Sequence, residues 1–212
     1  MPQLKYWDGS QWVDAVVGTP GNTGAQGVQG TQGPTGAVLS RGISGRFYNL
    51  DYVAVKGNST LTTANRMYIF PFYVGAPTTI NGFASASLGA ANSLFRIGIY
   101  NDDSGKPGTL LNDYGTLDLS TSGSKVLSFS SITLNGLYWV ACVDQGSGRA
   151  NVTAYGSDSF SNPYIGVSDV YSTGRGAFYT VDSITGALPS TLVGTTLNIS
   201  FVNGPMIWVR IA

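Results

Sequence analysis

The chain has 212 residues, of which 10% are charged, and its 11 acidic and 11 basic side chains cancel to a formal net charge of zero. A chain this neutral offers no electrostatic footprint for nucleic acid or an anionic membrane, and we expect neither as a partner. The sequence contains no histidine, which removes the commonest general base and the commonest metal ligand. We therefore expect no enzyme, no cofactor and no metal site.

Residues 1–17 are the first of three expected segments. Asp8-Gly9 is a turn signal between aromatic flanks, which predicts a β-hairpin. A hairpin this short is marginal alone, and we expect its aromatic side chains, Tyr6, Trp7 and Trp12, to attach the chain to another protein. The alternative is a local cap that only prevents fraying of the next segment.

Residues 18–38 keep glycine at every third position. The seven glycines are Gly18, Gly21, Gly24, Gly27, Gly30, Gly33 and Gly36. This strict period predicts a collagen-like stalk, because only glycine fits at the axis of a triple helix. A flexible glycine-rich linker is the alternative, although linkers keep no such period. The triple helix requires a homotrimer.

The stalk is expected to be weak. Pro20 and Pro34 are the only prolines at its X and Y positions. No charged residue lies between Asp14 and Arg41 to set the register by ion pairs. A weak rod needs an adjoining trimeric domain to bring three chains together. We expect residues 39–212 to be that domain.

Residues 39–212 alternate between short strands and turns, with no segment of helical periodicity. The expected class is all-β, with a C-terminal jelly-roll-like β-sandwich head. The expected strands are 66–73, 78–87, 93–100, 115–119, 125–131, 136–143, 150–155, 177–181, 195–202 and 206–211. The expected turns are 81–82, 101–108, 121–123, 145–148 and 203–205.

Two of these strands are apolar on both faces. In 137–143, Leu137, Trp139, Ala141 and Val143 alternate with Tyr138, Val140 and Cys142, and 206–211 follows a similar pattern. Such a strand packs one face in the core, and the other meets either a neighbouring subunit or a loop of its own chain. Because the glycine repeat requires a trimer, we favour the subunit contact.

Few residues suggest chemistry. Cys142 is expected to be a buried hydrophobe, since no histidine can activate it. Residues 101–105 resemble the start of a calcium loop but lack its closing glutamate, so a tight turn is favoured over an ion site at Asp102 and Asp103. The carboxylate pairs Asp113 with Asp118 and Asp144 with Asp158 have no spacing that selects them for hydrolysis.

The loop region 144–176 is the expected contact with a host surface. It is rich in glycine, serine and asparagine, the composition of adaptable recognition surfaces that also use aromatic anchors. The alternative is that its aromatic residues pack the loop onto the domain or line the trimer axis. The candidate contacts are Arg149, Tyr155, Phe160, Tyr164, Tyr171 and Arg175.

The segment 96–111, followed by 114–119 and 134–141, resembles the head domain of bacteriophage minor tail and fibre proteins. There a strand–loop–strand of the form GIY…G.PG.LL precedes a strand of the form L..G.YW.A. The layout of aromatic start, Gly-X-Y repeats and β domain also resembles collagen-containing phage fibres. The resemblance implies a trimeric appendage of the virion.

The resemblance also accounts for the expected location. The chain has neither a secretory signal nor an apolar run long enough to span a membrane, which fits a protein made in a host cytoplasm and released in virus particles. The expected partners are other virion proteins, at the N-terminus, and a host polysaccharide or protein. The alternatives are a capsid head fibre or decoration protein, a polysaccharide depolymerase, and a non-viral collagen-like filament.

Overall fold

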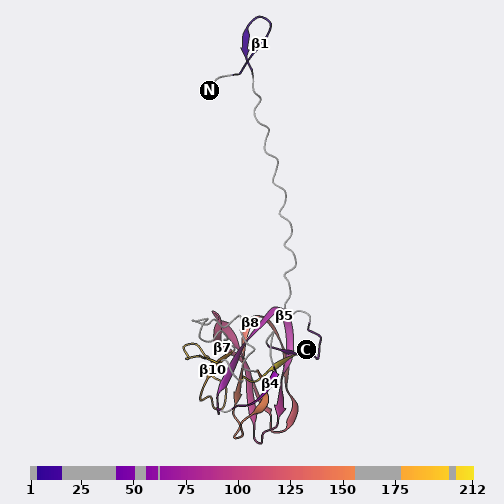
Figure 1. Cartoon of the computed structure of the whole chain (residues 1–212), viewed down its shortest axis with the longest axis vertical. Helices are drawn as coiled ribbons and strands as arrows, with labels where there is room; N and C mark the ends of the chain where they lie inside the picture. Colours follow the sequence, from indigo (N-terminus) through magenta and orange to yellow (C-terminus); the bar gives the residue numbers. More distant parts are fainter. Residues whose placement is uncertain (1–3, 16–41, 51–55, 62, 156–177, 201–203) are drawn as a thin grey trace. The chain divides into compact units, whose positions relative to one another are not determined.

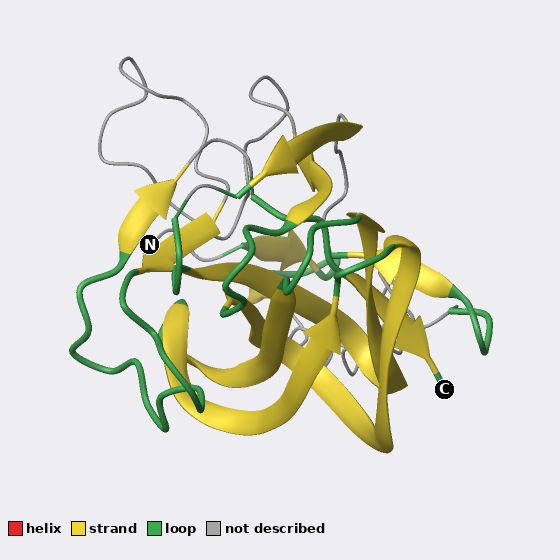
Figure 2. Cartoon of the chain, turned by 90° about the horizontal axis from the view of Figure 1, so that it is seen from below, coloured by secondary structure: helices red, strands yellow, loops and turns green. Residues whose placement is uncertain are grey.

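The computed structural model describes residues 4–15, 42–50, 56–61, 63–155, 178–200 and 204–212. These residues form twelve strands and no helix; Figure 2 draws them as strands and loops alone. The paired strands run antiparallel, as in the β5–β8, β6–β7 and β12–β5 pairs. The predicted all-β class is therefore confirmed. The chain divides into two compact units, Met1–Thr35 and Gly36–Ala212, which are described separately.

The first unit contains the predicted hairpin. Strand β1 (Lys5–Trp7) pairs with β2 (Trp12–Asp14), and Trp7 lies opposite Trp12. The glycine repeat at 18–38 lies outside the described residues, so its triple helix stays a prediction.

The second unit is built on two long strands, β5 (Met67–Leu88) and β8 (Ser122–Asp144), which pair along almost their whole lengths (Figure 1). The register shifts once between Val74 and Thr78, opposite Leu134 to Gly136. A β-bulge of this kind bends a strand. The remaining strands are β3 (Phe47–Asn49), β4 (Lys56–Thr60), β6 (Leu94–Asp103), β7 (Lys106–Asp118), β9 (Asn151–Tyr155), β10 (Phe178–Val181), β11 (Asn198–Ser200) and β12 (Trp208–Ile211).

The two halves of β5 belong to different layers. Its first half lies between β10 and the last part of β8. Beyond β8 the sheet continues with β6 and then β7, and we call these strands layer A. Its second half lies between β12 and the first part of β8, with β3 outside β12; we call these strands layer B. This arrangement is consistent with a β-sandwich.

The main core joins the two layers. Layer A contributes Phe70, Ile97 and Val140, and layer B contributes Phe83 and Val209, all almost wholly buried in one cluster. These positions alternate with side chains of the opposite face, as pleated strands require. The predicted role of Cys142 is confirmed, because its side chain is fully buried in this core and burial raises the pKa of its thiol.

A second cluster lies on the outer face of layer A. Trp139, Ala141 and Val143 are fully buried there against other strands of the layer and against Leu188 and Leu192. The favoured expectation that this face of 137–143 meets another subunit is therefore wrong. The chain covers the face itself.

The covering segment is 183–197, and hydrogen bonds hold it in place. Tyr100 Oη donates to Pro189 O over 2.9 Å, and Leu192 N donates to Gly108 O over 2.9 Å. Gly98 of β6 lies under Leu188, where a Cβ atom would collide with the leucine side chain. A glycine at this position therefore lets the segment approach the strand closely.

Several predicted boundaries are wrong. The strands predicted at 66–73 and 78–87 are one strand, and so are those at 125–131 and 136–143. The turn predicted at 81–82 lies inside β5, at its second register shift. Between 101 and 108 only Ser104 and Gly105 form the turn, and the strands continue on both sides. Strands β3 and β4 were not predicted.

The packing of segment 183–197 on the outer face of layer A can be tested by substitution. Leu188→Ala should lower the free energy of unfolding by about 2–4 kcal/mol, since it leaves a cavity in a packed site. Val193→Ala, in the same segment, is the matched control; Val193 is 57% exposed and its loss should cost less than about 0.5 kcal/mol. Chemical denaturation of both variants measures the difference, and equal effects would contradict the described packing.

Candidate functional site

The hairpin at residues 4–15 exposes its aromatic side chains. Trp7 and Trp12 pack edge to face with ring centroids 5.7 Å apart, and Lys5 and Asp14 form an ion pair of 3.4 Å beside them. Tyr6 lies opposite Val13 on the other face. Tyr6, Trp7 and Trp12 are 55%, 54% and 65% exposed. Exposed aromatics on a preformed hairpin suit contact with a protein partner.

The turn of this hairpin is fixed by Asp8. Its Oδ1 accepts hydrogen bonds from Ser10 N and Gln11 N, both at 2.8 Å, while Gly9 adopts a φ of 105°. These backbone hydrogen bonds lower the pKa of the exposed Asp8 carboxyl. The predicted turn at Asp8-Gly9 is confirmed, and it orients both strands before any partner is present.

Arg149 does not have the free position expected of a host contact. Its Nη1 lies 3.3 Å from Oδ2 of Asp144, and its Nη2 donates to Gly146 O. The arginine thus closes the loop between β8 and β9 from within. Its contribution is to hold this loop, which leads towards the remaining candidate contacts.

Asp144 at the end of β8 is the buried partner. Its side chain has no exposed area, its Oδ2 accepts from Ala150 N at 3.1 Å, and its Oδ1 has no partner among the described residues. Burial raises the pKa of this carboxyl, against the opposing effects of Ala150 N–H and the Arg149 cation. A buried carboxylate is costly unless it is paired, so the arginine is needed for stability.

The other candidate contacts are not assembled by the described residues. Tyr155 ends β9, opposite Lys56 of β4, and its side chain is outside the description. Phe160, Tyr164, Tyr171 and Arg175 lie outside the described residues altogether. The expectation that they form a recognition surface stays a prediction.

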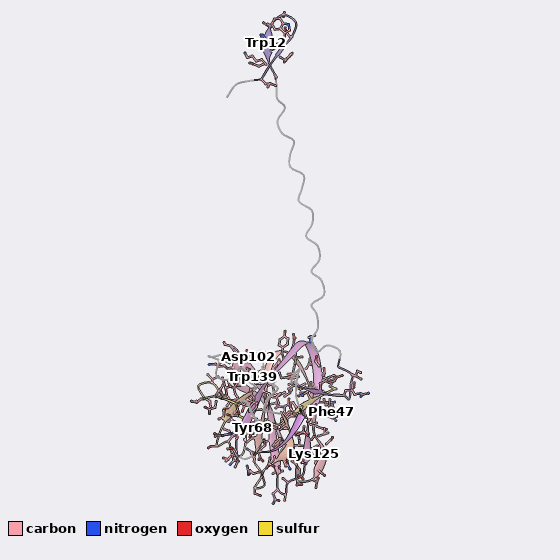
Figure 3. The ribbon with its side chains drawn as sticks, viewed as in Figure 1. Trp12, Phe47, Tyr68, Asp102, Lys125 and Trp139 are labelled. Carbon is pink, nitrogen blue, oxygen red and sulfur yellow. The ribbon has the colours of Figure 1, made fainter. Side chains whose placement is uncertain are left out.

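The 101–105 region is a tight hairpin turn. Asp102 Oδ1 accepts from Trp139 Nε1 at 2.8 Å, and Asp102 Oδ2 accepts from Gly105 N at 3.1 Å; Figure 3 labels Asp102 and Trp139 side by side. Ser104 and Gly105 both have positive φ, as a type I′ turn requires. Both carboxylate oxygens of Asp102 therefore serve the turn. The described residues contain no group of three or more side chains suited to a metal ion.

Of the two carboxylate pairs considered, only Asp113 and Asp118 are both described, and each carboxylate has partners of its own. Asp113 forms an ion pair with Arg96 at 2.8 Å and accepts from Leu188 N, while Asp118 accepts from Ser120 N. Burial alone would raise the pKa of Asp113, but the hydrogen bonds from Arg96, Leu188 and Gly115 outweigh it and lower the pKa. Asp158, the proposed partner of Asp144, lies outside the described residues.

A groove of about 460 Å³ lies beside the β6–β7 turn, and no pattern in the sequence indicates it. Asp103 and Lys106 stand at one side, and the exposed Val193 and Ile199 at another. The groove joins residues from β6, β7, β11 and the 183–197 segment. No local pattern predicts it, because these elements meet only through the fold.

Comparison with known proteins gives no relative. No family model matches the chain, and no curated protein matches it. Within the described residues, no helix has the length and apolar character needed to cross a membrane.

Arg149→Ala should lower the free energy of unfolding by roughly 3 kcal/mol at pH 7, because it leaves the Asp144 carboxylate buried without its cation. The cost arises from the ionised form of the Asp144 carboxyl, whose pKa is raised in the folded state. The loss should therefore shrink as the pH falls through the raised pKa of the folded state, because the buried carboxyl then takes up a proton before an exposed one would.

Denaturation at several pH values measures this effect. The control is Arg149→Ala in an Asp144→Asn background. This background has no carboxylate that could be left without its cation, so the substitution should lower the free energy of unfolding little at any pH. A loss from Arg149→Ala that does not vary with pH would contradict the buried ion pair.

Proposed function

We propose that this chain is a trimeric fibre of a bacteriophage virion. The observation that carries the proposal is the unbroken Gly-X-Y repeat at 18–38, placed between a hairpin and a β domain. A triple helix is the structure for which this period is required. The β head, taken as jelly-roll-like, then occurs three times at one end of a stalk about 60 Å long.

The two ends of the fibre have different tasks in this proposal. The hairpin offers Trp7 and Trp12 to other virion proteins, and its exposed aromatic rings support a contact with an apolar centre. The head contacts the host surface, a polysaccharide or a protein, through the loop region 144–176. A capsid head fibre with a mainly structural role is the second candidate, and the same exposed tryptophans support it equally.

The stalk is tested by Gly27→Ala in the full chain. A side chain at the crowded axis should disrupt the triple helix, so that the stalk melts at a lower temperature and is cut by proteases that spare the wild type. Val28→Ala, next to it at an X position, is the matched control and should behave as wild type.

Circular dichroism during heating and limited proteolysis measure the stability of the stalk. Electron microscopy measures the length of the rod. Equal protease sensitivity of both variants and the wild type would indicate a flexible linker. A wild-type solution mass equal to that of one chain would contradict the proposed fibre.

Host adhesion is tested by Tyr164→Ala and Tyr171→Ala. Each should weaken adsorption of the protein to host cells while the solution mass stays that of the wild type, because aromatic anchors in adaptable loops carry much of a contact. Unchanged adsorption by both variants would remove this loop as the site. Shortening of host polysaccharide by the wild type would favour the depolymerase instead.

A further inference from the structure

The outer face of layer B differs from the outer face of layer A. Cross-strand partners share a face, so Trp208, Ala84 and Val126, which lie opposite one another, belong to the outer face of the layer, although Trp208 is partly buried and also packs against the main core. Their core-facing neighbours Val209 and Phe83 confirm the alternation. We call this outward surface the layer-B face; it comprises Phe47, Ala84, Ala86, Leu88, Val126 and Trp208.

This face is apolar and partly exposed among the described residues. Phe47, Leu88 and Val126 are 41%, 40% and 40% exposed, and Trp208 is half-buried beside them. A shallow hollow of about 270 Å³ lies between Phe47, Trp208 and Val126, floored by the small side chains of Ala84 and Ala86. Exposed large apolar side chains gathered around small ones are typical of a surface that another protein covers.

The charges of the layer-B face suit contact with identical copies. The one charged side chain pointing outward from its described strands is Arg210, which donates to Asn81 Oδ1 at 2.7 Å and to Ser128 Oγ at 3.1 Å in its own chain. Lys125 pairs with Ser85 and belongs to the other face of the layer. Copies packed around an axis would therefore meet no row of like charges, which would otherwise oppose their association.

The chain also places this face close to the end of the stalk. Residues 42–46 are fixed to the last strand, because Gly45 N donates to Ile211 O at 2.9 Å and Ile211 N donates to Arg46 O at 3.1 Å. Three residues lie between Val38, the last position of the repeat, and Gly42, so four Cα-to-Cα steps join the two. At 3.3–3.6 Å per residue they span at most about 14 Å. Strand β3, with Phe47, begins just after this anchor and is an edge of layer B.

From these observations we infer that the layer-B face is the contact between head domains in the trimer, with second copies of this chain as its occupants. The inference rests on the proposed function. Three chains that leave one triple helix carry their β3 edges close to the three-fold axis. There Phe47 meets its copies, while Val126 and Trp208 pack on the neighbouring head. In Figure 3, Phe47 lies away from Asp102 and Trp139, whose side of the head the chain covers itself.

The double variant Phe47→Glu/Val126→Glu tests the inference in the full chain. Glutamates at this face bring like charges together around the axis and remove apolar contact, so the solution mass should fall threefold, to that of the 22.2 kDa chain. Val193→Glu is the control, since Val193 is an apolar side chain that is more exposed, at 57%, but lies on the segment that covers layer A. It should stay trimeric.

A cross-link gives a second measurement that does not disturb the contact. Phe47→Cys treated with a short bis-maleimide should yield linked chains on a denaturing gel, whereas Val193→Cys should not. The native Cys142 is fully buried and stays unlabelled in the folded protein. If circular dichroism shows that the double variant is unfolded, the cross-link decides.

The outcomes separate the inference from the proposal beneath it. A trimeric wild type whose double variant is also folded and trimeric, or whose Phe47→Cys chains do not cross-link, overturns the inference and leaves the fibre intact. A monomeric wild type overturns both.

Discussion

The pairing of β5 with β8 is the constraint on which the head depends. Both strands cross from one layer to the other, so their pairing, which shifts register at two points, places the side chains of both layers. In the layer A half, both faces are apolar, and hydrophobic alternation alone does not fix the register. In the layer B half, Phe83 belongs to the core while Ala84 faces outward, and a slip of one residue would exchange them. The alternation in the layer B half therefore fixes the register there, and the Thr79–Thr133 hydroxyl contact at 2.9 Å supports the pairing between the two register shifts.

The sequence was enough to predict the all-β class and most strands, because local alternation and turn residues report directly on local structure. The alternation of Phe95, Ile97 and Ile99 is an example: all three are fully buried in the core. The Asn81-Gly82 turn failed for a reason outside the local sequence. Asn81 Oδ1 accepts from Arg210 Nε at 2.7 Å, across 129 positions of the chain, and the arginine side chain lies against Gly82. A dipeptide that often makes a turn is thereby held in a strand.

The candidate site shows the same limit. An arginine in a loop rich in glycine and serine is expected to be exposed, yet Arg149 pairs with Asp144, which only the fold buries. The two-sided apolar pattern of 137–143 correctly indicated burial on both faces, but a pattern cannot say what covers them. The cover is 183–197, where Leu188 and Leu192 stand among polar residues with no strand periodicity. Aromatic exposure at Trp7 and Trp12 was predictable because so short a hairpin has no interior.

The head must also align the stalk in the proposed fibre. Three chains of a triple helix can form with several staggers, and the repeat carries no charged residue to select one. Just after the repeat, residues 42–46 are fixed to β12, so contact between heads would hold the three chains at a defined height. Such contact lowers the entropic cost of bringing the glycines of three chains together. A weak, uncharged rod then suffices as a spacer, because its alignment is determined where it meets the head.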